Sequence, residues 1–267
     1  MAYDIDNLDH RDPATLARAA DWVRRVLKPW HRAEVRGLER IPEGAALYVG
    51  NHSGGPYSGD TFIFCAEALA AHGLSAVPYA LAHEVFLRAP GLRQLLSPLG
   101  AVRASHDNAL RVFRGGGKVL VYPGGELDSL RPFRQRDRVV FGERRGYIRL
   151  ALRAGVPIVP VVAAGAHATL VVLDDMRWLA RALGTDRWLR LKALPIALSV
   201  PWGLTIGYVP PYLPLPSRML IEVLEPIRFD ESAEAADDES VVVACDARVR
   251  ELMQATLTRL ASERRQR

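Results

Sequence analysis

The sequence predicts an α/β fold: a single domain with a mostly parallel central sheet flanked by helices, and with amphipathic helices at its N- and C-terminal ends. Three observations lead to this prediction. Short apolar runs, typical of buried strands, alternate with segments of helical periodicity over residues 45–224. Two of these runs end in glycine-rich loops, at residues 50–59 and 123–125. The 267 residues are enough for one sizeable core, and nothing in the chain requires a second one.

The predicted domain has three parts along the chain: an N-terminal amphipathic helix region (1–34), an α/β body (35–229), and an acidic linker with a C-terminal helix packed on the same domain (230–267). In the first part, Asp12 is typical of an N-cap, and Pro29 is expected to end the helix. Basic residues on one face and an apolar stripe on another have two interpretations. The helix lies on a membrane surface, or it docks on the domain's own core.

The apolar run over residues 45–50 is predicted to be a buried strand that carries His52 at its carboxyl end, where open α/β sheets place their sites. Small residues around His52 let another molecule approach the imidazole closely. Asp60 follows, and a helix is predicted over residues 61–72. A carboxylate beside an imidazole fixes its tautomer and stabilises the imidazolium formed on proton abstraction. We therefore predict His52 and Asp60 as catalytic residues, with a helix cap as the alternative for Asp60.

Residues 74–104 have a mixed pattern that we interpret as strand, helix and strand, ending in Arg103. A guanidinium suits phosphate recognition because it can donate two parallel hydrogen bonds. An exposed arginine without a ligand is the equally good alternative. A short helix is predicted over residues 108–114.

The next strand, predicted over residues 118–122, leads into a second glycine-rich loop with two carboxylates. Two consecutive glycines can leave backbone amides open to a head group or an oxyanion. A plain hairpin turn is the alternative, and the sequence does not choose between the two carboxylates. The predicted substrate-binding residues are Arg103, Gly124, Gly125, Glu126 and Asp128.

The last part of the body contains three further patterns. Eight arginines between residues 131 and 153, opposed only by Asp137 and Glu143, form a solvated face or attract anionic head groups and acyl carriers. Two prolines in the run 156–160 predict a strand at an edge or a bulge. Residues 193–217 hold six prolines and no charged side chain, which excludes a spanning helix. This segment is either an irregular apolar flap that contacts lipid or covers an acyl groove, or a buried connection.

Composition narrows the class of protein. Hydrophobic residues at 49% and charged residues at 24% suit a globular protein, and the net charge of +5 suits anionic membranes, acidic substrates or nucleic acid. We expect no metal and no nucleic acid partner, because the sequence has no metal-ligand cluster and no basic-aromatic module. Two distant cysteines, the lack of a secretory signal and the lack of an apolar run of about 18 residues predict a cytoplasmic protein, peripherally associated with the inner face of the cell membrane.

Four motifs, taken together and in order, resemble the glycerolipid acyltransferase superfamily of lysophosphatidic acid and glycerol-phosphate acyltransferases. They are Asn51-His52 with a downstream Asp60, the run ending in Arg103, the Tyr-Pro-Gly-Gly loop at 122–125, and the Val-Pro-Ile-Val-Pro run at 156–160. The third motif is similar to that of the diacylglycerol-acyltransferase-like branch. In most members the carboxylate is the fifth residue after the histidine, and here that residue is Tyr57.

This resemblance implies an O-acyltransferase that moves a fatty acyl group from acyl-CoA or acyl-carrier protein to a hydroxyl of a glycerolipid such as a lysophospholipid, with no further cofactor. It implies that His52 is the general base, that Asp60 orients it, and that Arg103 contacts phosphate. Residues 35–229 would be the acyltransferase domain. Two alternatives remain: a lipid ester hydrolase that uses Ser53 or Ser58, and a catalytically silent lipid-binding protein.

Overall fold

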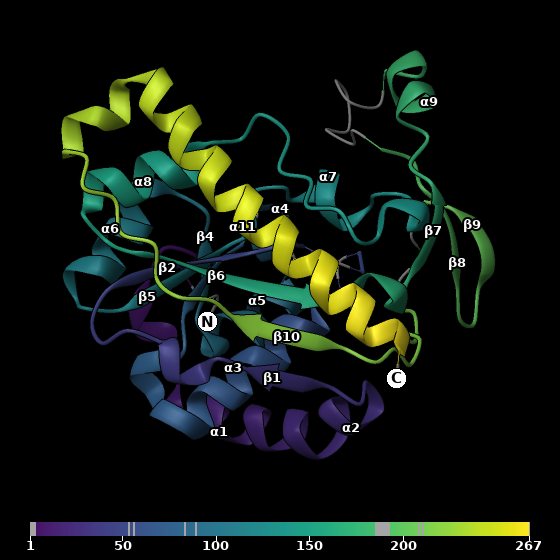
Figure 1. Cartoon of the computed structure of the whole chain (residues 1–267). Helices are drawn as coiled ribbons and strands as arrows, with labels where there is room; N and C mark the ends of the chain where they lie inside the picture. The colour runs from purple at the N-terminus through teal and green to yellow at the C-terminus, as the bar shows by residue number, and fades with distance from the viewer. Residues whose placement is uncertain are drawn as a thin grey trace.

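A computed structural model describes residues 4–52, 54–55, 57–82, 84–88, 90–184, 193–207, 209 and 211–266. In this part of the chain, a seven-stranded sheet lies at the centre and carries helices on both faces, while a three-stranded sheet projects at one side (Figure 1). The C-terminal helix crosses one face of the central sheet diagonally (Figure 1). The predicted class, α/β with a mostly parallel central sheet, is confirmed.

The helices and strands of the described residues have the following bounds. The helices are α1 (Pro13–Trp22), α2 (Lys28–Trp30), α3 (Gly59–His72), α4 (Glu84–Arg88), α5 (Pro90–Leu96), α6 (His106–Arg114), α7 (Glu126–Ser129), α8 (Gly146–Ala154), α9 (Arg177–Ala182) and α11 (Glu239–Gln266). The central sheet contains β1 (Glu34–Arg36), β2 (Ala46–Gly50), β3 (Tyr79–Ala82), β4 (Ala101–Arg103), β5 (Lys118–Val121), β6 (Ile158–Ala164) and β10 (Leu220–Val223). The smaller sheet contains β7 (Val171–Asp174), β8 (Ile196–Ser199) and β9 (Gly203–Ile206).

The order of the central sheet is β1-β10-β6-β2-β5-β3-β4. The pair of β10 and β6 is antiparallel, and the other neighbouring pairs are parallel. In the middle of the sheet, Val49 of β2 lies opposite Val121 of β5 on one side and Pro160 of β6 on the other. Because parallel neighbours end at the same edge, the loops after β2 and β5 begin side by side.

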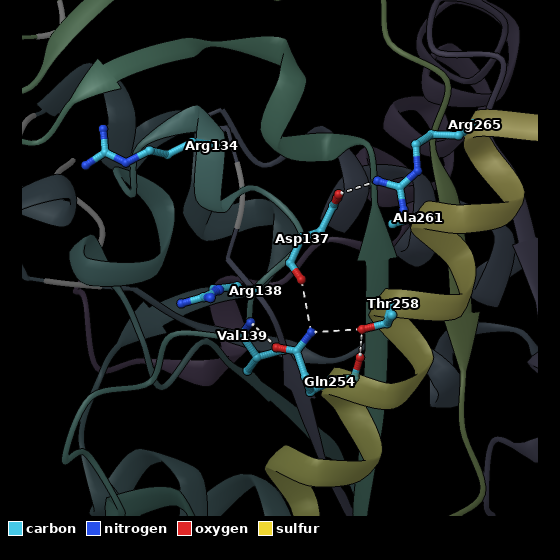
Figure 2. A pocket seen from close by; sticks show the side chains of 8 residues that line it. All are labelled: Arg134, Asp137, Arg138, Val139, Gln254, Thr258, Ala261 and Arg265. Atoms are coloured by element: carbon cyan, nitrogen blue, oxygen red, sulfur yellow. Dashed lines mark hydrogen bonds and ion pairs between the residues drawn. The ribbon is translucent and has the colours of Figure 1, made fainter.

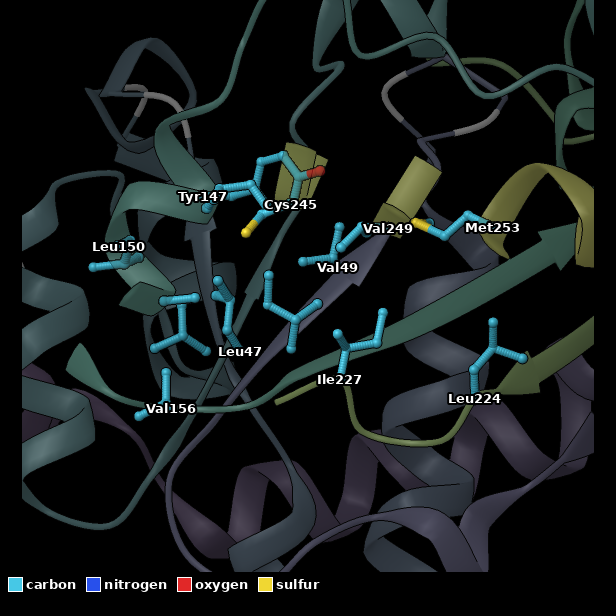
Figure 3. Packing of buried hydrophobic residues seen from close by; sticks show 14 of the residues in the cluster. Leu47, Val49, Tyr147, Leu150, Val156, Leu224, Ile227, Cys245, Val249 and Met253 are labelled. Atoms are coloured by element: carbon cyan, nitrogen blue, oxygen red, sulfur yellow. The ribbon is translucent and has the colours of Figure 1, made fainter. Parts of the chain in front are cut away.

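Alternate residues of the buried strands supply two separate hydrophobic clusters. Leu47 and Val49 of β2 face α6, α8 and α11, where they pack with residues such as Val249 (Figure 3). Tyr48 points to the opposite face, where its ring meets Phe64 of α3 edge-on with centroids 5.2 Å apart. Burial on both faces explains why β2 is a continuous apolar run rather than an alternating one.

The N-terminal helix begins as predicted, because the Asp12 carboxylate accepts hydrogen bonds from the amides of Ala14 and Thr15. It continues through a π-helical turn, Val23–Leu27, and ends at Trp30, one residue beyond the proline that was expected to end it. Its buried side includes Val23 and Leu27, which belong to the cluster around α3. The apolar stripe of this helix therefore docks on the domain's own core, the second of the two interpretations given above.

Strand β6 has neighbours on both sides, so the prediction of an edge strand is wrong, and the alternative of a bulge describes it better. Val161 lies opposite Val223, but Ile158 lies opposite Ile227, so the partner chain has one extra residue between these pairs. Pro160 sits within this irregular stretch and still accepts a hydrogen bond from the amide of Leu224 at 2.9 Å. Its missing N–H is therefore tolerated in the middle of the sheet.

The uncharged segment 193–217 is neither a buried connection nor wholly irregular. It forms the hairpin of β8 and β9, which pairs with β7 in the smaller sheet (Figure 1). Tyr208 and Pro210 of this segment lie outside the described residues. Within the part of the chain that the structure covers, no helix combines the length and the apolar character needed to cross a membrane.

The arginines between residues 131 and 153 differ in their contacts. On α8 and just before it, three arginines bind the acidic segment that leads into α11: Arg145 contacts Glu239 at 3.2 Å, Arg153 contacts Asp237 at 2.6 Å, and Arg149 also pairs with Glu239. These arginines hold the C-terminal segment on the domain. Other arginines of the run, Arg134 and Arg138 among them, are exposed.

Candidate active site

The imidazole of His52 and the ring of Tyr122 lie together at the ends of two neighbouring strands. Their ring centroids are 4.7 Å apart and their planes are inclined by 33°. Gly50, the last residue of β2, makes room for this pair: a Cβ there would lie 2.4 Å from the Tyr122 ring. The hydroxyl of Tyr122 is hydrogen-bonded to that of Thr61 in the first turn of α3.

A buried ion pair fixes the backbone of His52 from both sides. The His52 amide donates to Oδ2 of Asp128 at 2.6 Å, and the His52 carbonyl accepts from Nη1 of Arg131 at 2.8 Å. Asp128 and Arg131 are themselves 2.9 Å apart, and both are fully buried. Arg131 also donates to the carbonyls of Gln135 and Arg136, so the protein itself uses both edges of this guanidinium.

A second pair of residues fixes the loop just after His52. The Gly54 amide donates to Nδ1 of His167 at 3.3 Å, and Nε2 of His167 lies 2.8 Å from the carbonyl of Arg131. Since Nδ1 accepts a hydrogen bond, the proton of the neutral ring is on Nε2, which donates to that carbonyl. On the other side of the loop, the Tyr212 hydroxyl donates to the Gly54 carbonyl at 3.2 Å and accepts from the Tyr57 amide at 3.3 Å.

Sequence reasoning missed His167 and Tyr212. His167 lies in a 3-10 turn, Ala166–Thr169, that follows β6, and Tyr212 follows the hairpin of the smaller sheet. Their contacts with Gly54 join residues 113 and 158 positions apart. No local pattern indicates such contacts. A histidine directly after a buried strand at the same edge of the sheet was the one available signal for His167.

The imidazole of His52 is unprotonated at neutral pH, the form that a general base requires. Its Nδ1 is buried and has no hydrogen-bond partner among the described residues. Burial, and next the positive charge of Arg131, lower the pKa of His52 to about 4. The ring is therefore neutral near pH 7.

Asp60 lies in the first turn of α3 with 5% of its surface exposed. Burial raises its pKa to about 7, while the amides of Thr61 and of Asp60 itself lower it, as expected of a carboxylate at a helix start. No hydrogen bond joins Asp60 to Nδ1 of His52. The two residues are linked less directly, since Thr61 follows Asp60 and bonds the Tyr122 ring that packs on His52. The orienting role of Asp60 stays a prediction.

Arg103 lies away from this cluster, at the end of edge strand β4, and β3 separates it from β5. Its guanidinium makes a two-pronged contact with Asp6, at 2.8 and 2.7 Å. A phosphate would have to replace the Asp6 carboxylate on this guanidinium. The phosphate-binding role of Arg103 also stays a prediction.

The glycine loop is more tightly packed than the sequence suggests. A Cβ on Gly124 would lie 2.4 Å from both the Asp128 side chain and the carbonyl of Val140, so this glycine is required by close packing. Gly125 has a positive φ of 48°, and its amide donates to the Tyr122 carbonyl at 3.0 Å. The open amide expected at Gly125 is thus already in use.

The two carboxylates of this loop differ in exposure. Asp128 is fully buried, and its oxygens accept hydrogen bonds from the amides of His52 and Val140, so direct substrate binding by Asp128 does not fit its surroundings. Glu126, at the start of α7, is partly exposed, and within the described chain its side chain has no hydrogen bond or ion pair. Glu126 is therefore the carboxylate of this loop that a ligand can reach.

A cavity of about 630 Å³ opens between the loop after Arg131 and α11 (Figure 2). The cavity contains none of the predicted site residues; it is lined by Arg134, Asp137, Arg138, Val139, Gln254, Thr258, Ala261 and Arg265. Several of these join the two walls: Arg265 contacts Asp137 at 3.2 Å, and Gln254 donates to the Asp137 carbonyl at 3.0 Å (Figure 2). The cavity lies at the interface where α11 packs against the loop after Arg131. We do not propose it as the reaction site.

Removing the Tyr212 hydroxyl tests whether the loop must be held in place. Because Tyr212→Phe loses two hydrogen bonds to the loop, we expect kcat to fall by about tenfold, with little change in KM. Steady-state kinetics and thermal melting measure both effects. Tyr79→Phe, which removes a hydroxyl bonded to the Leu8 carbonyl, is the matched control and should keep kcat. Equal kcat values for the two variants would show that Tyr212 does not position the loop.

Comparison with known proteins identifies the family. Residues 32–164, which contain β2, the His52 loop and β5, match the family model described as Acyltransferase. Over 266 residues, 98% of this chain and 71% of the relative, the sequence is 31% identical to an uncharacterised protein of Mycobacterium tuberculosis. Over 132 residues, 49% of this chain and 39% of the relative, it is 33% identical to a mouse protein named "DGAT1/2-independent enzyme synthesizing storage lipids".

A solved structure shows the same fold. The crystal structure of the 1-acyl-sn-glycerophosphate (LPA) acyltransferase PlsC from Thermotoga maritima matches with a TM-score of 0.56 and 18% identity, over 92% of this chain and 79% of that one. The family match covers the residues that build the His52 loop and its neighbouring strand. This chain belongs to the acyltransferase family and is an acyltransferase.

Proposed function

We propose that this acyltransferase moves a fatty acyl group from an acyl thioester to a hydroxyl of a glycerolipid such as a lysophospholipid, with His52 as general base. The observation that carries the proposal is the neutral, partly exposed His52 imidazole on a backbone fixed by Asp128 and Arg131. A lipid acceptor is supported by the mouse relative, named as an enzyme synthesizing storage lipids, and a glycerolipid in particular by the Thermotoga structure, named as a 1-acyl-sn-glycerophosphate acyltransferase.

The proposed step needs one base and no covalent enzyme intermediate. The imidazole accepts the proton of the acceptor hydroxyl while its oxygen attacks the thioester carbonyl carbon. The C–S bond then breaks, a C–O ester bond remains, and the leaving sulfur takes the proton from the imidazolium. The products are an ester and a free thiol, carried by coenzyme A or by acyl-carrier protein. Glu126, partly exposed at the start of α7, is the contact that we propose for the acceptor at the glycine loop.

A hydrolase would need a serine nucleophile beside His52, and no contact among the described residues favours one. Ser53 lies outside the described residues, and Ser58, at the start of α3, makes no capping hydrogen bond and is not bonded to Nδ1 of His52. Labelled acyl-CoA, purified protein and a panel of lysophospholipids, a diglyceride and a long-chain alcohol provide the test. We expect labelled ester with a lysophospholipid; labelled free fatty acid would indicate the hydrolase, and binding without turnover a silent protein.

The same proposal places the protein at a membrane surface, because acceptor and product are bilayer lipids. We propose peripheral attachment to the inner face of the cell membrane, supported by the net charge of +5. For an acceptor that carries phosphate, Arg103 is the proposed contact, with Asp6 giving way to the phosphate.

The pH profile separates the contributions of His52 and Asp60. If ionised Asp60 must orient His52, kcat/KM falls as the pH drops through about 7, the raised pKa of Asp60. In Asp60→Asn this limb should vanish, leaving a lower plateau that falls only near pH 4, where His52 takes up a proton. Identical limbs in the two proteins would contradict the role of Asp60.

Stability measured over the same pH range provides the control. Because burial raises the pKa of Asp60 above its ordinary value, its protonated form suits the fold, and this contribution is lost as the pH rises through about 7. Asp60→Asn keeps a neutral group there, so we expect no loss of unfolding free energy at pH 8. A fall in rate at that pH would then report on catalysis.

A further inference from the structure

The outer face of the smaller sheet is apolar, although surface sheets normally expose polar residues on their free side. Leu198 of β8 lies directly opposite Leu204 of β9, and the exposed fractions of these residues are 46% and 66%. Ile206, which lies opposite Ile196, is 73% exposed. Residues directly opposite one another share a face. The inner face is buried around Ala197 and Val172. On the outer face the paired residues of β8 and β9 are apolar as well, and Asp174 of β7 lies opposite Ile196 at its border.

Exposed hydrophobic residues also occur on the segments next to the two paired strands. Further exposed hydrophobic side chains lie on β7, at the tip of the hairpin and on α9 with the residues after it: Leu173, Val200, Trp202, Trp178 and Leu183. Residues 193–217 contain no charged side chain. Asp174, at the end of β7, faces Arg134 with a 3.8 Å contact. An exposed apolar sheet face of this kind is typical of a docking site.

We propose that the outer face of the β7–β8–β9 sheet docks on the surface of a bilayer that contains anionic lipids. Two features favour a bilayer over a protein partner. Among the described residues, Arg134 and Arg138 are exposed on the loop beside β7, and Arg134 lies 3.8 Å from Asp174 at the end of that strand, so cations suited to anionic head groups border the sheet. The tip carries Trp202, whose indole donates to the Pro211 carbonyl at 2.6 Å, and tryptophan is typical of the boundary between lipid and water.

The β7–β8–β9 sheet is connected directly to the loop that follows His52. The Leu215 amide donates to the Thr169 carbonyl at 3.0 Å, and Tyr212 binds Gly54 and Tyr57. A Cβ on Gly55 would lie 2.7 Å from the side chain of Leu170, the residue just before β7. The loop after His52 and the smaller sheet are therefore packed tightly together. Docking would therefore hold the His52 loop beside the lipid surface. This last step rests on the proposed function, whereas docking itself does not.

Vesicle binding tests the docking face. The probe is co-sedimentation of the full chain with vesicles of phosphatidylcholine alone, or mixed with phosphatidylglycerol. Leu204→Ser with Ile206→Ser should weaken binding to the mixed vesicles on the order of tenfold, because attachment scales with the apolar area that enters the interface. Trp22→Ser with Val26→Ser is the matched control, since it removes two exposed apolar side chains from the N-terminal helix (55% and 48% exposed) and should change binding little.

Three results would overturn the proposal: unchanged binding of the hairpin variant, loss of binding in the helix variant alone, or equal binding of the unaltered protein to both kinds of vesicle. A fourth comes from size-exclusion chromatography with light scattering. If the unaltered protein is a dimer that the hairpin substitutions convert to a monomer, the face belongs to a second copy of this chain. Thermal melting should show both double variants folded, because the replaced side chains are exposed.

Activity assays keep this proposal separate from the proposed function. With a short-chain acceptor dissolved as monomers, the hairpin variant should match the unaltered protein, and with the acceptor in vesicles it should be slower on the order of tenfold. Failure of the docking proposal alone would leave the variant fully active on vesicles. Failure of the proposed function would leave both proteins inactive on dissolved acceptor while vesicle binding persists.

Discussion

Replacing His52 with alanine is expected to lower kcat by about 10² to 10⁴-fold, or about 3 to 5 kcal/mol of barrier, because the reaction loses the general base that we propose. The fold should survive. The hydrogen bonds to Asp128 and Arg131 come from the His52 backbone, and Nδ1 has no partner to lose. Kinetics with an acyl thioester and a lysophospholipid, together with thermal melting, measure both effects.

His72→Ala is the matched control for this substitution. His72 is an exposed histidine at the end of α3, bonded to the Leu38 carbonyl at 2.9 Å, and its loss should leave kcat unchanged. A folded His52→Ala enzyme with a kcat near that of the unaltered protein would eliminate the mechanism. Equal losses in both variants would indicate a general effect on the protein and not the loss of a base.

Replacing Arg131 with methionine is expected to have the largest effect on stability. It leaves the buried Asp128 carboxylate without its ion pair, and breaking such a pair typically costs about 3 to 5 kcal/mol of unfolding free energy. Activity should fall as well, because the His52 carbonyl loses its donor. Urea unfolding followed by circular dichroism gives the first quantity. Arg138→Met, at an exposed arginine of the same loop, should stay within about 0.5 kcal/mol.

The origin of this loss can be checked with pH and with a second substitution. Burial raises the pKa of Asp128 to about 6 while Arg131 lowers it, so removing Arg131 should raise this pKa further. A protonated Asp128 no longer needs the cation, and the loss caused by Arg131→Met should therefore shrink from pH 8 to pH 5. Adding Asp128→Asn should recover part of the stability. If the loss of stability does not depend on pH and is not reduced by Asp128→Asn, it arises from packing and not from the unpaired carboxylate.

Much of the fold could be predicted because its signals are local. The run at 45–50, the cap at Asp12 and the glycine after α3 are visible within a few residues, and the structure confirms the elements that they predict. The pairing of strands depends on distant residues. The sequence therefore did not show that β8 and β9 would form a sheet with β7, because the prolines of that segment indicated irregular structure.

The same division holds for the site. His52 and the Tyr-Pro-Gly-Gly loop follow neighbouring parallel strands, so their proximity could be expected from the fold class. The choice between Glu126 and Asp128 could not, because it depends on which side chain is buried by the turn. Arg103 shows a third case, since the contact that occupies it comes from Asp6, 97 positions earlier.

The order of strands in the central sheet has a consequence for synthesis on the ribosome. Strand β1 emerges early, yet Val35 lies opposite Ile221 of β10, and among the described strands β1 has no other neighbour. The loop that holds Asp128 is likewise fastened late, since Val139 donates to Gln254 of α11 at 2.9 Å. A growing chain therefore exposes β1 until most of the protein has been translated, and the loop that holds Asp128 acquires its full support only after α11 leaves the exit tunnel.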